Sequence, residues 1–272
     1  MKSIRKKIVA AIFLCSILSA MLVGTIAAGN SMQMANRDTQ ERMQMTCQIQ
    51  AEVLNAMILR IEQSVDSLSD VVMADFDYDK FTKDKGYADT YTEQVVGYVH
   101  QFAARTEGAI TAYVRYNPDY SNPTSGCFLS RESITQDFDE LVPTDFSMYD
   151  EDDVAHVGWY YTPVKNGAPM WMEPYLNENI NVYMISYVVP LYSESGESIG
   201  IVGMDIDFSQ ITGIVDTMTI YDTGYAFLTN EAGTIMYDKE LETGTDFAGV
   251  DASTAAIAAS FADETKQGVL QS

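Results

Sequence analysis

The sequence contains few of the residues that build cross-linked or metal-bound domains. Three cysteines and two histidines occur among its 272 residues. Cys15 lies within an apolar run, and Cys47 and Cys127 are far apart, so the spacing predicts no disulfide framework. His100 and His156 are isolated from each other and from any cysteine pair, which argues against a zinc site. We expect no metal and no cofactor.

Motifs of the common hydrolases are also missing. The sequence has no Gly-X-Ser-X-Gly, and no Ser-His-Asp or Cys-His order stands out. Residues 75–79 begin like a calcium-binding loop, but Lys80 replaces the turn glycine and Gly86 replaces the bidentate glutamate. The acidic run at 150–153 is predicted to be a solvated loop, because like charges at that spacing repel one another. We predict that this chain is not an enzyme.

Basic residues are scarce. The chain has 16 Lys and Arg against 39 Asp and Glu, a net charge of −23. Four of the basic residues fall in the first seven positions, so the rest of the chain carries 12 basic residues and a net charge of −27. Nucleic acid and anionic lipid surfaces are therefore not expected partners. The 47% hydrophobic and 11% aromatic content predicts a folded domain.

Residues 8–28 form an uninterrupted apolar run behind a basic flank at residues 1–7. About 20 apolar residues are enough for a helix to cross a membrane, and a basic flank tends to stay in the cytoplasm. We predict a transmembrane helix in the cell membrane, with the remainder of the chain extracytoplasmic. The alternative is a cleaved secretory signal, whose apolar core usually runs about 7 to 15 residues.

Residues 29–75 are predicted to form a long extracytoplasmic helix. The stretch 32–73 has no Gly or Pro and is rich in helix-forming residues. After Ile58 we expect its apolar seam to pack on the chain's own domain. Around Cys47 the seam favours a homodimer, in which a crosslink between chains is conceivable. The seam comprises Cys47, Ala51, Leu54, Ile58, Ile61, Val65, Leu68 and Val72.

Beyond this helix the hydrophobic period changes from that of helices to that of strands. β-branched and aromatic runs that end at Gly, Pro or Asn are typical of strands. A helix followed by antiparallel strands in two batches predicts an α+β architecture with two stacked subdomains. The predicted elements are helices at 91–105 and 209–218, strands at 109–116, 184–190 and 198–206, and two strands within 224–237.

Several stretches together resemble the extracellular double Cache domain of bacterial transmembrane receptors. No single stretch is specific, and the resemblance depends on their order and spacing over nearly the whole chain. After the anchor and the long helix they are Gly158-Trp159-Tyr160, Glu173-Pro174-Tyr175, Ile185 to Pro190, Gly200 to Asp207 and Thr223 to Leu228.

The resemblance implies two PAS-like antiparallel sheets. A membrane-distal ligand-binding subdomain would occupy residues 76–208, and a membrane-proximal subdomain would occupy 209–272. The second is incomplete at Ser272, and no second apolar span follows Asp207, so the chain looks like a truncated receptor. The family plan implies a cytoplasmic output module beyond it, such as a methyl-accepting hairpin, a kinase or a diguanylate cyclase.

The ligand positions of the family are only partly kept. Members that sense amino acids hold the ligand carboxylate with an arginine just before the Trp-Tyr pair, whereas His156, Val157 and Gly158 stand there in this chain. Neither Val157 nor a neutral histidine replaces a guanidinium fork. Asn177 stands where those sensors often have an acid. Ordinary α-amino acids are therefore less favoured as ligands.

What remains is an aromatic box with a carboxylate, which suits a cation. We expect an amine to bind at Trp159, Tyr160, Tyr175 and Asp205, which match the family's positions. The alternative is that the rings only pack the sheet and that Asp205 caps a turn. Arg115 leaves a carboxylate, amino acid or purine as the fallback ligand. Tyr113, Trp171 and Tyr187 are further candidate walls, and Glu173 is a second candidate acid.

Two function classes follow from these expectations. The first is the ligand-sensing ectodomain of a transmembrane signalling receptor, for chemotaxis or another response. The second is a membrane-tethered solute-binding or interaction module without signalling output. Ligand would have to favour one arrangement of the helices over another for the first class to hold.

Overall fold

The computed structural model describes residues 2–177, 182–220, 224–230, 232–251, 254–255 and 258. Helix α1 (Lys2–Ala74) is continuous for 73 residues through the predicted anchor and the predicted long helix. Its N-terminal part is long and apolar enough to cross a membrane, with a mean hydropathy of 2.4, a test that a signal sequence also passes. The two predicted helical segments are therefore one helix.

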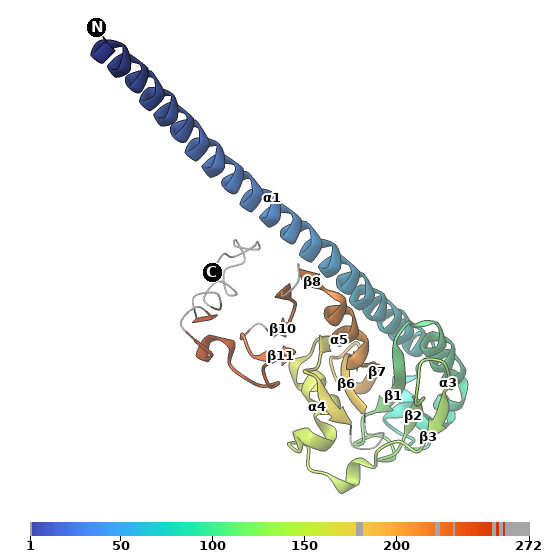
Figure 1. Cartoon of the computed structure of the whole chain (residues 1–272). Coiled ribbons are helices and arrows are strands. Elements are labelled where there is room, and N and C mark those ends of the chain that lie inside the picture. The colour runs from blue at the N-terminus through green and yellow to red at the C-terminus, as the bar shows by residue number, and fades with distance from the viewer. Residues whose placement is uncertain are drawn as a thin grey trace. The chain divides into compact units, whose positions relative to one another are not determined.

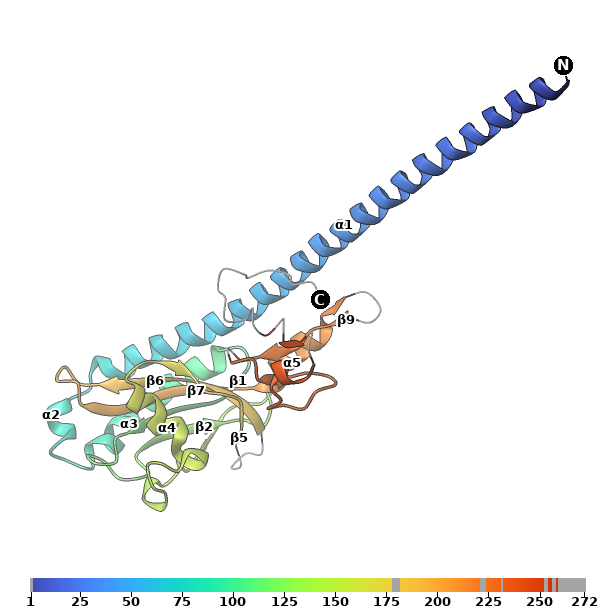
Figure 2. The ribbon, with the colours of Figure 1, turned by 90° about the vertical axis from the view of Figure 1, so that its left-hand side faces the viewer.

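The centre of the fold is a seven-stranded sheet in the order β3-β2-β1-β7-β6-β4, with β5 also paired to β6. All of its strand pairs are antiparallel, and β6 and β7 form the predicted hairpin. Figure 2 shows β1, β6 and β7 side by side. The strands are β1 (Ala109–Tyr116), β2 (Gly126–Ser130), β3 (Asp139–Leu141), β4 (Met170–Trp171), β5 (Tyr175–Asn177), β6 (Val182–Tyr192) and β7 (Ser198–Asp207).

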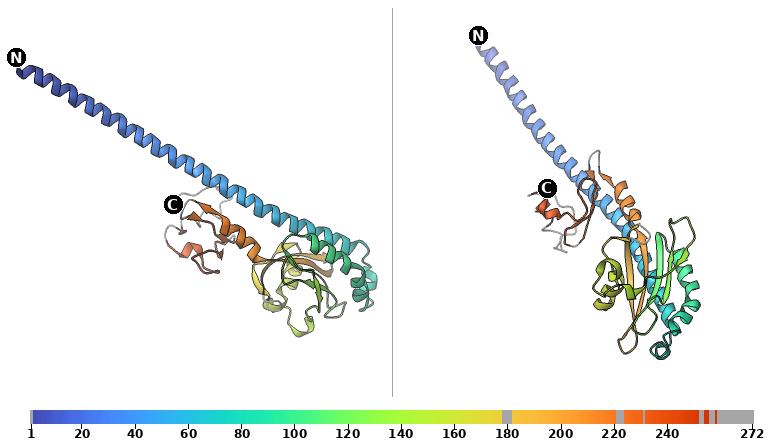
Figure 3. Two further views of the ribbon diagram at one scale, coloured as in Figure 1. Left: turned by 45° about the vertical axis from the view of Figure 1, so that its right-hand side comes forward. Right: turned by 90° about the horizontal axis from the view of Figure 1, so that it is seen from below.

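Both faces of this sheet are covered. Helix α3 (Tyr87–Arg105) lies on one side and α4 (Val154–Asn166) on the other, as the edge-on view in Figure 3 shows in teal and yellow-green. All eight residues of β1 are buried as a result. The short helix α2 (Tyr78–Phe81) precedes α3, and a 3-10 turn, η1 (Phe146–Met148), precedes α4.

The face covered by α3 and the C-terminal part of α1 is called the helix face, and it is apolar. Every other residue of β1 and β7 points into it, and each fully buried Val, Leu or Ile there contributes about 1.5–3 kcal/mol. The seam of α1 beyond Ile58 packs here, as the sequence predicts. The buried residues that meet on this face include Ile61, Val65, Leu68, Val72, Val95, Val99, Ala112, Val114, Val202, Met204 and Ile206.

The opposite face, called the aromatic face, is covered by α4 and η1. Helix α4 is absent from the predicted elements; the acidic loop at 150–153 ends in its N-cap, where the Asp153 side chain accepts a hydrogen bond from the His156 backbone N–H. The core of this face consists of Tyr113, Phe146, Val157, Tyr160, Val188 and Ile201.

The C-terminal part of the chain holds only short elements. Helix α5 (Phe208–Thr217) follows β7, and β10 (Leu228–Thr229) pairs with β11 (Ile235–Tyr237) around the predicted turn. Thr223 and Glu231, which belong to the predicted strands and turn, lie outside the described residues, as does 259–272. The remaining elements are β8 (Thr219–Ile220), β9 (Gly224–Tyr225) and a 3-10 turn, η2 (Phe247–Gly249).

The chain divides into two compact units. One comprises Ala51–Asn230 and Thr234–Thr245, and so contains the C-terminal part of α1 with the whole seven-stranded sheet. The other comprises Met1–Gln50, Glu231–Gly233 and Asp246–Ser272. Figure 1 labels α1, α3, α4, α5 and most of the strands. The α+β class with a long N-terminal helix and antiparallel sheets is confirmed. The predicted domain limits at 75 and 208 stay a prediction.

Gly203 is where β7 gives room to an aromatic ring. A Cβ at this position would lie 2.5 Å from two ring carbons of Tyr113, its neighbour across the strand pair. We expect Gly203→Ala to lower the free energy of unfolding by about 1–3 kcal/mol, because the ring must shift in a packed layer. Thermal unfolding in detergent, followed by near-ultraviolet circular dichroism, measures the change.

Gly97→Ala is the matched control for this substitution. Gly97 is exposed in α3, with no atom within 4 Å of the added Cβ, so alanine there should be neutral or stabilise the helix by up to about 1 kcal/mol. Equal effects of the two substitutions would contradict the close contact at Gly203.

Candidate functional site

Asp205 is a buried carboxylate on the aromatic face. It lies in the middle of the sheet, opposite Thr111 on β1 and Ser186 on β6, and its exposed fraction is 1%. Oδ1 accepts a hydrogen bond of 3.1 Å from the Tyr113 hydroxyl, and Oδ2 accepts one from the Thr111 hydroxyl. Asp205 forms no ion pair within the described part of the chain. Hydroxyl groups therefore satisfy its oxygens without neutralising its charge.

The surroundings of Asp205 act on its pKa in opposite directions. Burial is the larger influence and raises the pKa of the carboxyl above its usual 3.8, while hydrogen bonds from Thr111, Ser186 and Tyr113 lower it. The carboxylate in turn contributes, after burial itself, to raising the pKa of the Tyr113 hydroxyl. A cation placed beside Asp205 would favour its ionised form.

Aromatic rings from four elements pack against one another on this face, and Tyr113 joins them to Asp205. The Tyr113 ring stacks on Phe128 of β2 at 5.8 Å and meets the Trp159 ring of α4 edge-on at 5.2 Å. Phe146 of η1 lies 4.6 Å from the Tyr160 ring and 6.0 Å from that of Trp159. The helical spacing of α4 thus turns the Trp-Tyr pair onto the sheet.

Tyr175 lies on β5, the strand paired with β6, and completes the Asp205 group. This group consists of Asp205, Thr111, Tyr113, Tyr175 and Ser186. Its hydroxyl accepts a 3.2 Å hydrogen bond from the Ser186 hydroxyl, and burial, followed by the charge of Asp205, raises its pKa. Ser186 is fully buried and lies directly across the strand pair from Asp205. Side chains from β1, β5 and β6 therefore meet near the carboxylate on β7.

Arg115 is on the same face, two positions along β1 from Tyr113. Its Nε donates to the Ser125 carbonyl at 3.1 Å, and Nη2 donates to the carbonyls of Pro123 and Thr144 at 2.9 and 2.7 Å. The guanidinium carbon sits 4.2 Å from the centre of the Phe146 ring. Burial lowers the pKa of this guanidinium to about 10, so it remains charged at neutral pH.

Three sequence candidates lie away from this group. Trp171 and Tyr187 pair on the helix face, where the Trp171 Nε1 donates to Glu62 Oε1 of α1 at 2.8 Å and the Tyr187 hydroxyl donates to Asp66 Oδ1 at 3.4 Å. Tyr187 is the residue after Ser186 on β6, and successive side chains of a strand point to opposite faces. Tyr187 and its partner Trp171 therefore face the helices and not Asp205. Glu173 is exposed.

The structure adds residues that the sequence reading did not select. Thr111 and Ser186 both hydrogen-bond to Asp205. Phe128 stacks on Tyr113, and Phe146 packs on the rings of α4 and on Arg115. The period of two along β1 would have found Thr111, since it precedes Tyr113 and Arg115 on the same face. Nothing local in the sequence points to Phe146, because it reaches the site from a turn.

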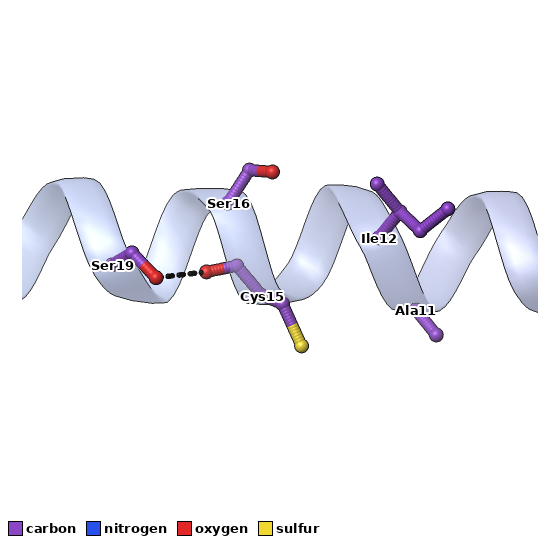
Figure 4. Close-up of a pocket in the computed structure, with 5 residues that line it drawn as sticks. All are labelled: Ala11, Ile12, Cys15, Ser16 and Ser19. Carbon is purple, nitrogen blue, oxygen red and sulfur yellow. Dashed lines mark hydrogen bonds between the residues drawn. The ribbon is translucent and has the colours of Figure 1, made fainter.

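A separate hollow lies on the surface of α1 within the predicted anchor. Figure 4 shows the five residues that line it, and the Ser19 hydroxyl there donates to the Cys15 carbonyl at 2.8 Å. It is bounded by one helix, in a segment apolar enough to face lipid, and its lining includes no charged side chain. This hollow is a feature of the helix surface. It is lined by Ala11, Ile12, Cys15, Ser16 and Ser19.

The segment that contains the sheet corresponds to a known class of domain. Residues 95–213 match the family described as methyl-accepting chemotaxis protein-like, first PDC sensor domain. This segment runs from α3 to α5 and includes the whole seven-stranded sheet. The segment is a Cache-type (PDC) sensor domain, which confirms the resemblance found in the sequence.

Solved structures share the fold at low sequence identity. The ligand-binding domain of the Campylobacter jejuni chemoreceptor Tlp3, in complex with 4-methylisoleucine, is 15% identical and has a TM-score of 0.53, covering 76% of this chain and 74% of that one. The extracellular domain of mmHK1S-Z3, assigned as a histidine kinase, is 16% identical with a TM-score of 0.54, covering 84% and 79%. The fold is thus that of extracellular sensor domains.

One curated relative matches part of the chain. Methyl-accepting chemotaxis protein McpG of Pseudomonas putida is 29% identical over 102 residues, which make up 37% of this chain. The match spans 16% of the length of that receptor.

The charge of Asp205 makes stability depend on pH. Because its folded pKa lies above 3.8, the folded chain holds more proton between 3.8 and the folded value, so the free energy of unfolding falls as pH rises through that window. Asp205→Asn should remove this part of the slope while leaving the fold intact. Urea unfolding of both proteins at a series of pH values measures it, and parallel curves would show that Asp205 does not titrate in the fold.

Proposed function

We propose that this chain is the extracytoplasmic sensing part of a bacterial transmembrane signalling receptor, and that it binds a small molecule through an ammonium group. The observation that carries the proposal is Asp205, a carboxylate buried among aromatic rings without a cationic partner in the described residues. Buried charges are normally paired. A protonated amine supplies the missing charge.

The rings around Asp205 suit the same ligand. Tyr and Trp faces attract cations, by about 2 kcal/mol when the contact is desolvated. Tyr113 hydrogen-bonds to Asp205, and the Trp159 ring meets the Tyr113 ring edge-on. A charged hydrogen bond to Asp205 would add about 1.5–3 kcal/mol. An apolar ligand would leave the carboxylate unpaired, so it is disfavoured.

The strand β6 offers a route from this site to α1. Ser186 points into the Asp205 group, while the next residue, Tyr187, donates a hydrogen bond to Asp66 of α1. A ligand that shifts β6 would act on both faces of the sheet at once. Signalling would then require the ligand to bind one position of the strand more tightly than the other.

The long helix supports the membrane part of the proposal. An apolar segment follows Arg5, Lys6 and Lys7, and we propose that this basic end stays in the cytoplasm while the sensor domain lies outside. The domain itself would be non-catalytic, with output supplied by a cytoplasmic module of the full receptor.

Amine binding is tested by calorimetry on the whole chain in detergent. We expect a polyamine or monoamine to bind, and Asp205→Asn to weaken that binding about tenfold or more, because a buried charged hydrogen bond is lost. Affinity should also fall as pH drops through the folded pKa of Asp205. Glu140→Gln, at the exposed strand β3, removes one negative charge elsewhere and should leave the affinity unchanged. Binding of carboxylates but of no amine would sink the proposal.

The proposed homodimer is tested at Cys47. This thiol is free and exposed on α1, and neighbouring Met45 and Ile49 are exposed as well. We expect mild oxidation of the chain in membranes to give a covalent dimer on a non-reducing gel, and Cys47→Ser to abolish it while Cys127→Ser does not, since Cys127 is buried. A dimer band that survives Cys47→Ser would contradict a dimer contact through the apolar seam at Cys47.

A further inference from the structure

Arg115 is a buried charge whose neighbours satisfy its donors only in part. Its exposed fraction is 0%, and its Nη1 has no hydrogen-bond partner among the described residues. The three carbonyl groups that it contacts through Nε and Nη2 accept hydrogen bonds but carry no net charge. The guanidinium therefore lacks a counter-charge as well as a partner for Nη1, and both needs would be met by an anion.

The nearby carboxylate of Asp145 does not fill this role. Asp145 is the N-cap of η1, and its Oδ1 accepts hydrogen bonds from the backbone N–H and the hydroxyl of Ser147. No ion pair between Asp145 and Arg115 occurs in the described residues, although the negative charge of Asp145 acts on the guanidinium at longer range. Among the described residues, no carboxylate side chain thus pairs with Nη1.

Asp205 and Arg115 are opposite poles of one face. Asp205 lies across from Thr111, and Arg115 is four residues further along β1 on the same side, which places the Cα atoms of 111 and 115 about 13 Å apart. Between the two poles lie the rings of Tyr113, Trp159 and Phe146, each within 6.0 Å of the next. A ligand with a cationic group at one end, an anionic group at the other and an apolar chain between them would complement this face.

We propose that the aromatic face binds a linear amino acid whose ammonium and carboxylate groups are separated by several methylenes, with the ammonium at Asp205 and the carboxylate at Nη1 of Arg115. The inference rests on the proposed function for the ammonium end. An α-amino acid carries both groups on one carbon, so it cannot reach both poles. The methylene chain would lie along the rings of Tyr113, Trp159 and Phe146.

Access to Arg115 leads past the turn η1. Phe146 covers the guanidinium, while Val142 and Met148 on either side of it are exposed. Surface turns of this kind move at lower cost than strands of the sheet. The carboxylate would reach Nη1 by displacing the Phe146 ring.

Matched compounds test the second pole without any mutation. Calorimetry on the whole chain in detergent would compare 4-aminobutanoate, 5-aminopentanoate and 6-aminohexanoate with the alkylamines and the alkanoates of the same chain lengths. We expect one amino acid to bind about tenfold or more tighter than its alkylamine, which is the effect of one charge-assisted hydrogen bond.

Two arginine variants show where the preference arises. Arg115→Gln should remove the preference for the amino acid and leave alkylamine affinity unchanged, and Arg115→Lys should retain part of it. Arg131→Gln is the control, because Arg131 also donates to backbone carbonyls and lies 4.4 Å from the centre of a ring, that of Phe138, but it follows β2 outside the Asp205 group. Circular dichroism checks that each variant folds.

Each result separates the two proposals. Equal affinities of the amino acids and the alkylamines at every length would overturn the anion subsite and leave the amine proposal standing. Alkanoates that bind in an Arg115-dependent way, with no binding of alkylamines, would overturn the amine proposal and support the anion subsite. Absence of binding by all three series would overturn both.

Discussion

The two-sided burial of strand β1 is the constraint on which the rest of the domain depends. Its neighbours β2 and β7 saturate its hydrogen bonds, and α3 with α1 on one side and α4 on the other cover its side chains. Thr111, Tyr113 and Arg115 turn toward the aromatic face, while the residues between them pack into the apolar helix face. A slip of one residue in the register would bury Arg115 in that apolar layer. The pairing of β1 with β7 therefore decides both the core and the composition of the site.

The polar groups on the aromatic face carry a cost that the apolar layer offsets. A buried carboxylate and a buried guanidinium each lose hydration, and neither gains an ion pair within the described residues. Hydroxyl groups and backbone carbonyls reduce that loss without removing it. Groups held in this way are typical of functional sites, where a ligand supplies what the fold does not. The same reasoning applies to both ends of the face.

The strand β6 links the site to the helix that runs to the membrane segment. Adjacent residues on a strand point to opposite faces, so Ser186 and Tyr187 contact the Asp205 group and α1 respectively. Trp171, opposite Tyr187 on β4, adds a second hydrogen bond to α1 through Glu62. Those two aromatic residues were selected from the sequence as walls for a ligand. Their position makes them contacts between the sheet and the helix.

The sequence alone determined the features that depend on local pattern. The apolar run at 8–28 and the absence of Gly and Pro from 32 to 73 predicted two helical segments, because propensity acts residue by residue, and the structure joins them into one helix. Strand periodicity predicted β1, β6 and β7, and the order of short motifs predicted the sensor fold. Only the tertiary structure decided which candidates share a face, since that depends on register and on the helix that covers each side. It placed Arg115 and Asp205 on the aromatic face and brought Phe146 to Arg115 from a distant turn. Trp171 and Tyr187 face the helices instead, because successive side chains of a strand point to opposite sides.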